Sequence, residues 1–232
     1  MQTRYFDRFL LATLAATEME ALDELDATRC LAPQERLRDE SMHSPRARRQ
    51  FRVGRVAFKT AFFAVREGRA AETIALEEAL RRDEYGALEV VTRDERNRGI
   101  SPRLAEDVRR GSISHVPTAA VAAFPLNVAD ALGCDVVEFG AVKRNMLDLF
   151  FTDSERARLT DPDVWATEEQ DVVWAVKEAA YKAVSRELPF KPNQIEVVAI
   201  SPGNYRARVE GTEVSAFVVD RDQQFATVVA LR

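Results

Sequence analysis

The chain has 232 residues, of which 46% are hydrophobic and 31% are charged, enough for one globular domain or two small ones. Its net charge of -5 argues against a general nucleic-acid-binding surface, which requires an excess of basic residues. The first 26 residues are too polar to span a bilayer and have no cleavage site, so we expect a cytoplasmic protein without membrane contact. Two cysteines and two histidines are too few for a zinc site or a disulfide framework, so any metal must bind to oxygen atoms.

The first half of the chain shows mainly helical periodicity. Apolar residues at helical spacing predict amphipathic helices over 6–24, 50–66 and 71–82. Short runs rich in β-branched and small apolar residues predict strands at 88–94 and 118–126.

The second half alternates differently, with helices between strands. A strand is predicted at 133–139, followed by helices at 149–159 and 167–185. Each of these helical segments contains a Thr with Glu or Gln three residues later, which is the spacing of a capping box. The last four predicted strands are 194–200, 204–210, 213–220 and 225–232.

One short internal repeat suggests that the halves are related. Residues 57–61 (AFKTA) and 175–179 (AVKEA) share the pattern Ala-apolar-Lys-x-Ala, and a small-residue strand follows each copy. We therefore predict two related α+β halves that pack together and meet near residues 126–132, with a cleft between them as the ligand site.

A basic segment and a short strand carry candidate phosphate contacts. Residues 44–59 concentrate cations in an acidic protein: Arg46, Arg48, Arg49, Arg52, Arg55 and Lys59. They form either a solvated helix face or a phosphate clamp, because guanidinium groups bind phosphate oxygens in a bidentate manner. Ser114 and His115 precede a strand, and by themselves they are more typical of a surface than of a site.

Two acidic residues lie in apolar surroundings. Asp135 lies inside the apolar strand GCDVVEF, where it is either a turn acid at the strand end or a metal ligand. Glu178 lies in WAVKEAAYK with Lys182 one helical turn further on, and Trp174 shares their face. An ordinary helix ion pair explains Glu178 and Lys182 on an exposed face, but not on a face shared with Trp174. Together with the cations, the two acids suggest a magnesium site for phosphoryl transfer or phosphoanhydride cleavage.

The segments SISH, GCDVVEF, FFTDSERARL and WAVKEAAYK, in this order and at these separations, resemble the 4'-phosphopantetheinyl transferase superfamily. The chain length, the paired halves and RRQFRVGRVAFK are similar to its pseudodimeric surfactin- and enterobactin-type branch, rather than to the short trimeric holo-acyl-carrier-protein synthases. The resemblance covers most of residues 44–232. It implies an α+β fold of two pseudo-symmetric halves with the active site in the cleft between them.

The resemblance also implies roles for the halves and for individual residues. Residues 1–126 would bind coenzyme A, and residues 127–232 would bind magnesium and catalyse the reaction. Asp135 and Glu178 would hold Mg2+, Glu155 would accept the serine proton, and Lys182 would stabilise the leaving phosphate. The expected coenzyme A contacts are Arg48, Arg55, Ser114, His115, Lys177 and Lys182, with a further contact within residues 93–102. The capping-box position of Glu155 beside Thr152 leaves a purely structural role open for that residue.

Two departures from the family pattern affect these expectations. Val137 occupies the slot of a third carboxylate in many pseudodimeric members, and Glu138 lies one residue later on the opposite face, so we expect two protein carboxylates on the metal. The strand that often begins the first half of the family fold is not evident, because residues 1–26 read as helical.

The expected function is transfer of the 4'-phosphopantetheine group from coenzyme A to a serine of an apo acyl, peptidyl or aryl carrier protein. The products would be the holo carrier and adenosine 3',5'-bisphosphate, and the two halves in one chain suggest a monomer. Two alternatives stay open: a non-catalytic coenzyme A-binding relative, and a magnesium-dependent nucleotide anhydride hydrolase.

Overall fold

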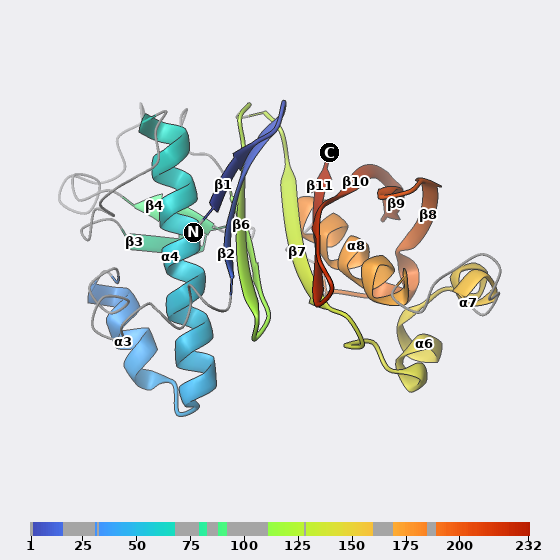
Figure 1. The fold of residues 1–232 in the computed structure, drawn as a ribbon, viewed down its shortest axis with the longest axis horizontal. Helices are drawn as coiled ribbons and strands as arrows, with labels where there is room; N and C mark the ends of the chain where they lie inside the picture. The colour runs from blue at the N-terminus through green and yellow to red at the C-terminus, as the bar shows by residue number, and fades with distance from the viewer. Residues whose placement is uncertain are drawn as a thin grey trace. The chain divides into compact units, whose positions relative to one another are not determined.

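The computed structural model describes residues 2–15, 31, 33–67, 79–82, 88–91, 111–127, 129–159, 169–184 and 189–232. The chain forms two compact units, Met1–Asp130 and Ala131–Arg232 (Figure 1). Each unit contains an antiparallel sheet with one long helix packed on it, so the predicted α+β class is confirmed for both halves. The further expectation of an active site between the halves stays a prediction.

Unit 1 has a four-stranded sheet in the order β1-β2-β6-β5. Its strands are β1 (Gln2–Tyr5), β2 (Phe9–Ala15), β5 (Ser112–His115) and β6 (Ala119–Pro125). The long helix α4 (Pro45–Glu67) packs on β2 and β6, and Phe58 and Phe124 meet in the core with ring centroids 4.5 Å apart. The short helix α3 (Pro33–Ser41) packs beside α4, and β3 (Ala79–Arg82) pairs with β4 (Leu88–Val91).

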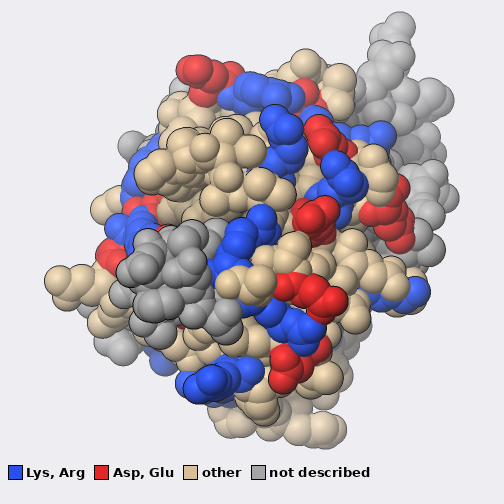
Figure 2. Space-filling model, turned by 90° about the vertical axis from the view of Figure 1, so that its right-hand side faces the viewer, with Lys and Arg blue, Asp and Glu red and all other residues tan. Residues whose placement is uncertain are grey.

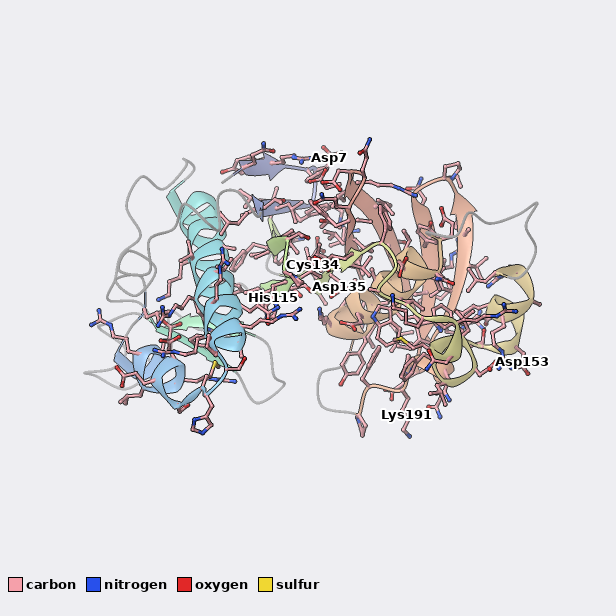
Figure 3. All side chains as sticks on the ribbon, turned by 60° about the horizontal axis from the view of Figure 1, so that its bottom comes forward. Asp7, His115, Cys134, Asp135, Asp153 and Lys191 are labelled. Carbon is pink, nitrogen blue, oxygen red and sulfur yellow. The ribbon has the colours of Figure 1, made fainter. Side chains whose placement is uncertain are left out.

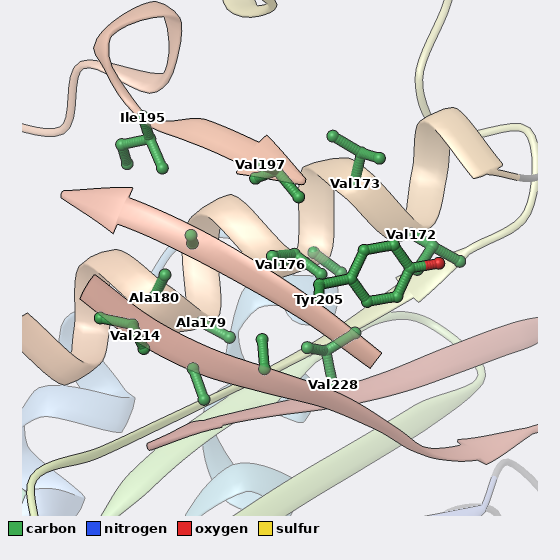
Figure 4. Packing of buried hydrophobic residues seen from close by; sticks show 14 of the residues in the cluster. Val172, Val173, Val176, Ala179, Ala180, Ile195, Val197, Tyr205, Val214 and Val228 are labelled. Atoms are coloured by element: carbon green, nitrogen blue, oxygen red, sulfur yellow. The ribbon is translucent and has the colours of Figure 1, made fainter. Parts of the chain in front are cut away.

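Unit 2 has a five-stranded sheet in the order β7-β11-β10-β9-β8. Its strands are β7 (Leu132–Glu138), β8 (Glu196–Ser201), β9 (Asn204–Val209), β10 (Thr212–Arg221) and β11 (Phe225–Leu231). Its helices are α6 (Arg144–Phe150), α7 (Asp153–Leu159), α8 (Glu169–Val184) and the 3-10 turn η1 (Pro192–Gln194). Figure 4 shows the core, in which Val172, Val176 and Ala179 of α8 lie among buried side chains of the sheet.

The two units repeat one arrangement, as the short sequence repeat predicted. In unit 1 the order is strand, long helix and hairpin, with β6 paired between β2 and β5. In unit 2 the corresponding elements are β7, α8 and the β10–β11 hairpin, with β11 paired between β7 and β10. The additional strands β8 and β9 extend only the sheet of unit 2 on the side of β10.

The predicted helix over residues 6–24 is wrong where the structure describes it. Residues 2–5 and 9–15 are the antiparallel strands β1 and β2, and the rest of that segment lies outside the described residues. The run FLLATLA is buried throughout residues 9–14, so it has no solvent face whose period could distinguish a strand from a helix. Residues 1–26 therefore contain the opening strand that the sequence did not reveal.

Smaller differences concern the other predicted elements. Residues 79–82 form β3 where a helix was predicted, and residues 71–78 lie outside the described part. The predicted helix 149–159 is interrupted at Phe151 and Thr152, between α6 and α7. The other predicted helices and strands are confirmed within the described residues, and none of the described helices is long and apolar enough to cross a membrane.

Gly133→Ala is expected to destabilise the protein by about 3 kcal/mol or more, because a Cβ at this position would lie 2.0 Å from the carbonyl oxygen of Ala179. Backbone atoms cannot move aside as the end of a flexible side chain can, so α8 and β7 would have to separate. Chemical denaturation measures the change. Gly140→Ala is the matched control, since its φ of +80° costs about 1–2 kcal/mol but its Cβ meets nothing within 4 Å. Equal losses in the two variants would contradict this account of Gly133.

Candidate functional site

Asp135 lies in the middle of β7, where it is buried and has an exposed fraction of 3% (Figure 3). Strand β7 pairs with β11, and Asp135 lies opposite Val228. A buried carboxylate requires a counter-charge, and the ammonium group of Lys182 provides it at 2.7 Å from Oδ1 of Asp135. The same ammonium group donates to the carbonyl oxygen of Cys134 at 3.1 Å.

Glu178 and Lys182 lie one turn apart on α8, on the side of the helix that meets β7. Nζ of Lys182 is 3.7 Å from Oε2 of Glu178, and their side chains are 23% and 30% exposed respectively. Asp135 lies close enough to Glu178 to raise the pKa of its carboxyl group. The structure thus brings together Asp135, Glu178 and Lys182, as the sequence predicted for the core of the site. We call these three residues the acid–lysine cluster.

The acid–lysine cluster changes the protonation of its members. Burial raises the pKa of Glu178 from the ordinary value of 4.5 to about 7, and the adjacent Asp135 carboxylate acts in the same direction, whereas Lys182 opposes it. Burial by itself lowers the pKa of Lys182, but Asp135 and Glu178 outweigh it, so that pKa is raised. Near neutral pH in the absence of metal, the Glu178 carboxyl group is therefore protonated for part of the time.

A carbon-13 NMR titration of the metal-free protein is expected to show the Glu178 carboxyl group titrating near pH 7. Because its pKa is higher in the folded than in the unfolded state, the metal-free protein should lose stability as the pH rises from 4.5 to about 7. Asp135→Asn removes a repulsive charge and should shift the titration to lower pH. An unchanged midpoint in that variant would contradict the coupling between the two carboxyl groups.

The acid–lysine cluster fits a small divalent cation bound with few protein ligands. Asp135 and Glu178 provide carboxylate oxygens, the ligands that Mg2+ prefers, and Mg2+ commonly takes only one or two protein carboxylates beside water and substrate oxygens. Val137 is 4% exposed and belongs to the hydrophobic core, so this slot supplies no third oxygen. Across the described ranges, no group of three or more His, Cys, Asp or Glu side chains forms a metal-binding cluster.

Lys177 and Glu155 form a separate, fully buried ion pair. Their side chains are 0% and 1% exposed, and Nζ of Lys177 is 2.6 Å from Oε2 of Glu155. Glu155 lies in the predicted capping box, because Thr152 N donates to its Oε2 at 2.8 Å and its own N–H donates to Thr152 Oγ1 at 3.3 Å. Burial lowers the pKa of Lys177, and Glu155 opposes this shift. The structure thus places Glu155 and Lys177 in a buried pair, and the expected roles of Glu155 as base and Lys177 as pyrophosphate contact stay predictions.

Trp174 shares the Glu178 face by helical spacing, but its ring lies in an aromatic cluster. Its ring centroid is 5.1 Å from that of Phe150 and 5.7 Å from that of Phe190, which in turn contacts Tyr181 at 5.0 Å. The Trp174 ring therefore packs against other aromatic rings of unit 2. Its presence on the same helical face as Glu178 is thus explained by packing.

In unit 1, the basic segment on α4 is partly neutralised by two acids of α3. Glu35 lies 3.4 Å from Nε of Arg55 and 2.6 Å from Nζ of Lys59. The guanidinium group of Arg55 also lies over the ring of Phe51, 4.7 Å from its centroid, and its side chain is 8% exposed. Arg55 is thus held in place within the unit, and a phosphate would reach it only beside Glu35.

Asp39 binds the other two cations of this segment that face α3. It accepts hydrogen bonds from Nε of Arg52 at 2.9 Å and from Nη2 of Arg52 at 2.7 Å, and from Arg48 at 3.2 Å. Arg48 remains 36% exposed at its side chain, whereas Arg52 is 9% exposed. The solvated-face and phosphate-clamp interpretations therefore both overlook the carboxylates of α3, which sequence spacing alone could not place.

Asp39→Asn is expected to destabilise unit 1 by about 3 kcal/mol, since it leaves the buried Arg52 guanidinium without its counter-charge. Burial by itself raises the pKa of Asp39, but hydrogen bonds from Arg52 and Arg48 outweigh it and leave that pKa below its usual value. A lowered carboxyl pKa gives stability that is present above about pH 4 and is lost as the pH falls through the folded-state pKa. Denaturation at pH 7 and pH 3 should therefore show a smaller difference between variant and wild type at pH 3.

Ser114 and His115 lie at the end of β5, with Ser114 half-buried and His115 exposed (Figure 3). Helix α4 approaches them at Gly54, where a Cβ would lie 2.9 Å from Ile113 and 3.7 Å from the His115 ring. The structure therefore brings His115 beside the Gly54–Arg55 turn of α4. The loop 93–102, where another coenzyme A contact was expected, lies outside the described residues.

Of the two related units, only unit 2 has acidic residues at the positions of Asp135 and Glu178. Asp135 lies opposite Val228, and in unit 1 Thr13 lies opposite Val121, which matches Val228 in the strand repeat. On the helices, the repeat aligns position 60, a threonine, with Glu178. Threonine thus occupies both corresponding positions of unit 1. The sequence contains this signal, but it is visible only once residues 9–15 are known to form a strand.

Several charged side chains on the surface of unit 2 form local ion pairs. Arg208 lies 3.6 Å from Glu213, and Arg156 contacts Asp148 at 3.0 Å as well as Asp153. Figure 2 shows one face of the molecule on which Lys and Arg lie among Asp and Glu. On this face the charges give no extended area of a single sign.

Comparisons with known proteins place unit 2 near one family. Residues 131–230 match the family model of the 4'-phosphopantetheinyl transferase superfamily. This range lies wholly within unit 2, carries the acid–lysine cluster, and is less than half of the chain. A search of the curated proteins finds no match.

Two solved structures are similar in part. A holo-(acyl-carrier-protein) synthase from Bacillus anthracis str. Ames, in complex with CoA (3',5'-ADP), is 22% identical with a TM-score of 0.39. The match covers 51% of this chain and 93% of that one. A holo-[acyl-carrier-protein] synthase from Neisseria meningitidis is 19% identical with a TM-score of 0.37, over 51% of this chain and 95% of that one.

Proposed function

We propose that this protein is a member of the 4'-phosphopantetheinyl transferase superfamily and transfers the phosphopantetheine group of coenzyme A to a serine of an apo carrier protein. The acid–lysine cluster is the observation that carries the proposal, because it joins two carboxylates and an ammonium group within the segment that matches the family model. The two related α+β units support the pseudodimeric branch of the superfamily.

The residues of the cluster have distinct roles in the proposed reaction. Asp135 and Glu178 would hold a Mg2+ ion, which when bound would neutralise charge on the pyrophosphate of coenzyme A. Lys182 holds Asp135 in place and would stabilise the negative charge that develops on the leaving adenosine 3',5'-bisphosphate. Because Glu178 ionises near pH 7, its carboxylate form, which binds a cation, predominates only above that pH when no metal is present.

Coenzyme A would bind to unit 1 through exposed polar groups near the Gly54–Arg55 turn. His115 is exposed beside this turn, and Arg48 keeps a third of its side chain accessible. These two side chains are the accessible members of the expected coenzyme A set in unit 1, with Ser114 half-buried next to them. Arg55 would contribute mainly to the local positive potential, since it is mostly buried against Glu35 and Phe51.

Incubation with coenzyme A, Mg2+ and a panel of apo acyl, peptidyl and aryl carrier proteins tests the proposal by intact mass. A carrier that gains the phosphopantetheine mass, with release of adenosine 3',5'-bisphosphate, is the expected result. Cleavage of coenzyme A without any modified carrier would instead indicate a hydrolase, and binding without cleavage would indicate a non-catalytic coenzyme A-binding protein. Either of these outcomes across carriers of all three types would contradict the proposed transfer.

A further inference from the structure

The buried pair Lys177–Glu155 lies next to Glu178 of the proposed metal site, and its two side chains are 0% and 1% exposed. Lys177 immediately precedes Glu178 on α8, so the two side chains leave the helix about 100° apart. Three acceptors surround the Lys177 ammonium group: Oε2 of Glu155 at 2.6 Å, and the carbonyl oxygens of Pro192 at 2.8 Å and Ile195 at 2.6 Å. An ammonium group has three N–H donors, so these acceptors use all of them.

Glu155 is held just as completely. Its Oε1 accepts the backbone N–H of Val197 at 2.8 Å, and its Oε2 accepts that of Thr152 at 2.8 Å in addition to Lys177. Through these bonds, one turn of α8 is tied to α7, to the η1 turn and to the start of β8. A rotation of α8 about its axis would break several charge-assisted hydrogen bonds in the protein interior.

The other side of α8 is fixed by close contact with β7. Gly133 has no side chain, and the carbonyl oxygen of Ala179 occupies the space that a Cβ would need. Glu178 lies between Lys177 and Ala179 in the sequence, so it is held from both sides. The direction in which its Cα–Cβ bond leaves the helix is therefore set by contacts that do not involve Asp135 or Lys182.

Unit 1 contains an equivalent pair without the acids. Lys59 occupies the place of Lys177 in the helix repeat, is 0% exposed, and lies 2.6 Å from Glu35 of the preceding short helix. Positions 13 and 60 of unit 1 are both threonine. The buried pair occurs in both units, whereas the acids occur only in unit 2. The pair therefore belongs to the repeated fold of the units and not to the reacting groups.

We propose that Lys177 and Glu155 are positioning residues, which fix the rotation of α8 and thereby set the separation of the Asp135 and Glu178 carboxylates. The inference rests on the proposed role of these two carboxylates as metal ligands. The consequence is specific: loss of the pair should weaken the binding of a divalent cation, whereas the chemistry should recover when the cation is saturating.

The test uses the full-length double variant Lys177→Met/Glu155→Gln, which removes both charges and nearly preserves side-chain length. The affinity for Mn2+ is measured by electron paramagnetic resonance in the absence of coenzyme A and carrier protein. We expect it to fall about tenfold or more in the variant. If Lys177 and Glu155 act only by positioning Glu178, the turnover of this variant should rise toward the wild-type value as Mg2+ becomes saturating. Glu155→Gln alone is the second variant if the double variant fails to fold.

Lys59→Met/Glu35→Gln is the matched control, because it makes the same change in the frame that has no acids and should leave Mn2+ affinity unchanged. If the folded 177/155 variant binds Mn2+ as tightly as wild type, the inference is overturned. This holds whether the variant is merely less stable or also loses turnover at saturating Mg2+. The latter loss would support chemical roles for Glu155 and Lys177.

The inference and the proposed function can fail separately. If the wild-type protein binds no Mn2+, or if Asp135→Asn leaves its binding unchanged, the proposed metal site is wrong. A crystal structure of the 177/155 variant then tests the inference by itself, because the Glu178 carboxylate should move away from Asp135. An unchanged contact between Glu178 and Asp135 would overturn it.

Discussion

Glu178→Gln is expected to abolish activation by Mg2+ and to lower turnover by roughly a thousandfold. The amide keeps the size of the side chain but has no negative charge, so Asp135 alone would remain to bind the cation. The substitution should not unfold the protein, since the ionised Glu178 is disfavoured beside Asp135 at high pH, as its raised pKa indicates. We therefore expect thermal unfolding of the metal-free variant at pH 8 to occur at the wild-type temperature or above it.

Turnover as a function of Mg2+ concentration and direct Mn2+ binding measure this effect. Glu213→Gln is the control, because it makes the same chemical change at an exposed residue whose partner, Arg208, is also exposed. If the Glu178 variant were activated by Mg2+ as well as wild type, Glu178 would not be a metal ligand. The proposed function would then lose its central residue.

Lys182→Ala is expected to lower turnover by a hundredfold to a thousandfold, which corresponds to about 3–4 kcal/mol of transition-state stabilisation. Lys182 is the ammonium group at hydrogen-bonding distance from Asp135, and 23% of its side chain is exposed, so a leaving phosphate could reach it. The lost positive charge should also raise the pKa of Glu178 further, because Lys182 normally lowers it.

Single-turnover rates at saturating Mg2+ separate the effect of Lys182 on chemistry from its effect on metal affinity. Lys191→Ala removes an exposed lysine of the same unit and should leave the rate unchanged (Figure 3). A Lys182→Ala rate close to wild type, measured on a folded variant, would remove Lys182 from the mechanism.

The sequence by itself determined the helices and strands that have a clear local periodicity, and the site residues that lie on them. The periodicity of residues 50–66 and 167–185 predicted α4 and α8, and the alternation around Asp135 predicted β7. The order of the motifs then placed Asp135, Glu178 and Lys182 in one site, and the structure brings these three together. Helical spacing of four residues is enough to pair Glu178 with Lys182, because it holds wherever the helix forms.

Tertiary structure alone decided the partners of the buried charges and the fold of the first strand. The sequence near Lys177 does not predict its pairing with Glu155, which is 22 positions earlier. Likewise, the basic segment does not predict its contacts with Asp39 and Glu35 of α3. The run FLLATLA became β2 because it pairs on both sides with other strands, a choice that depends on neighbours distant in the sequence. Local pattern therefore fixed which residues can do chemistry, whereas long-range pairing decided which of the candidate charges are available for it and which hold the frame.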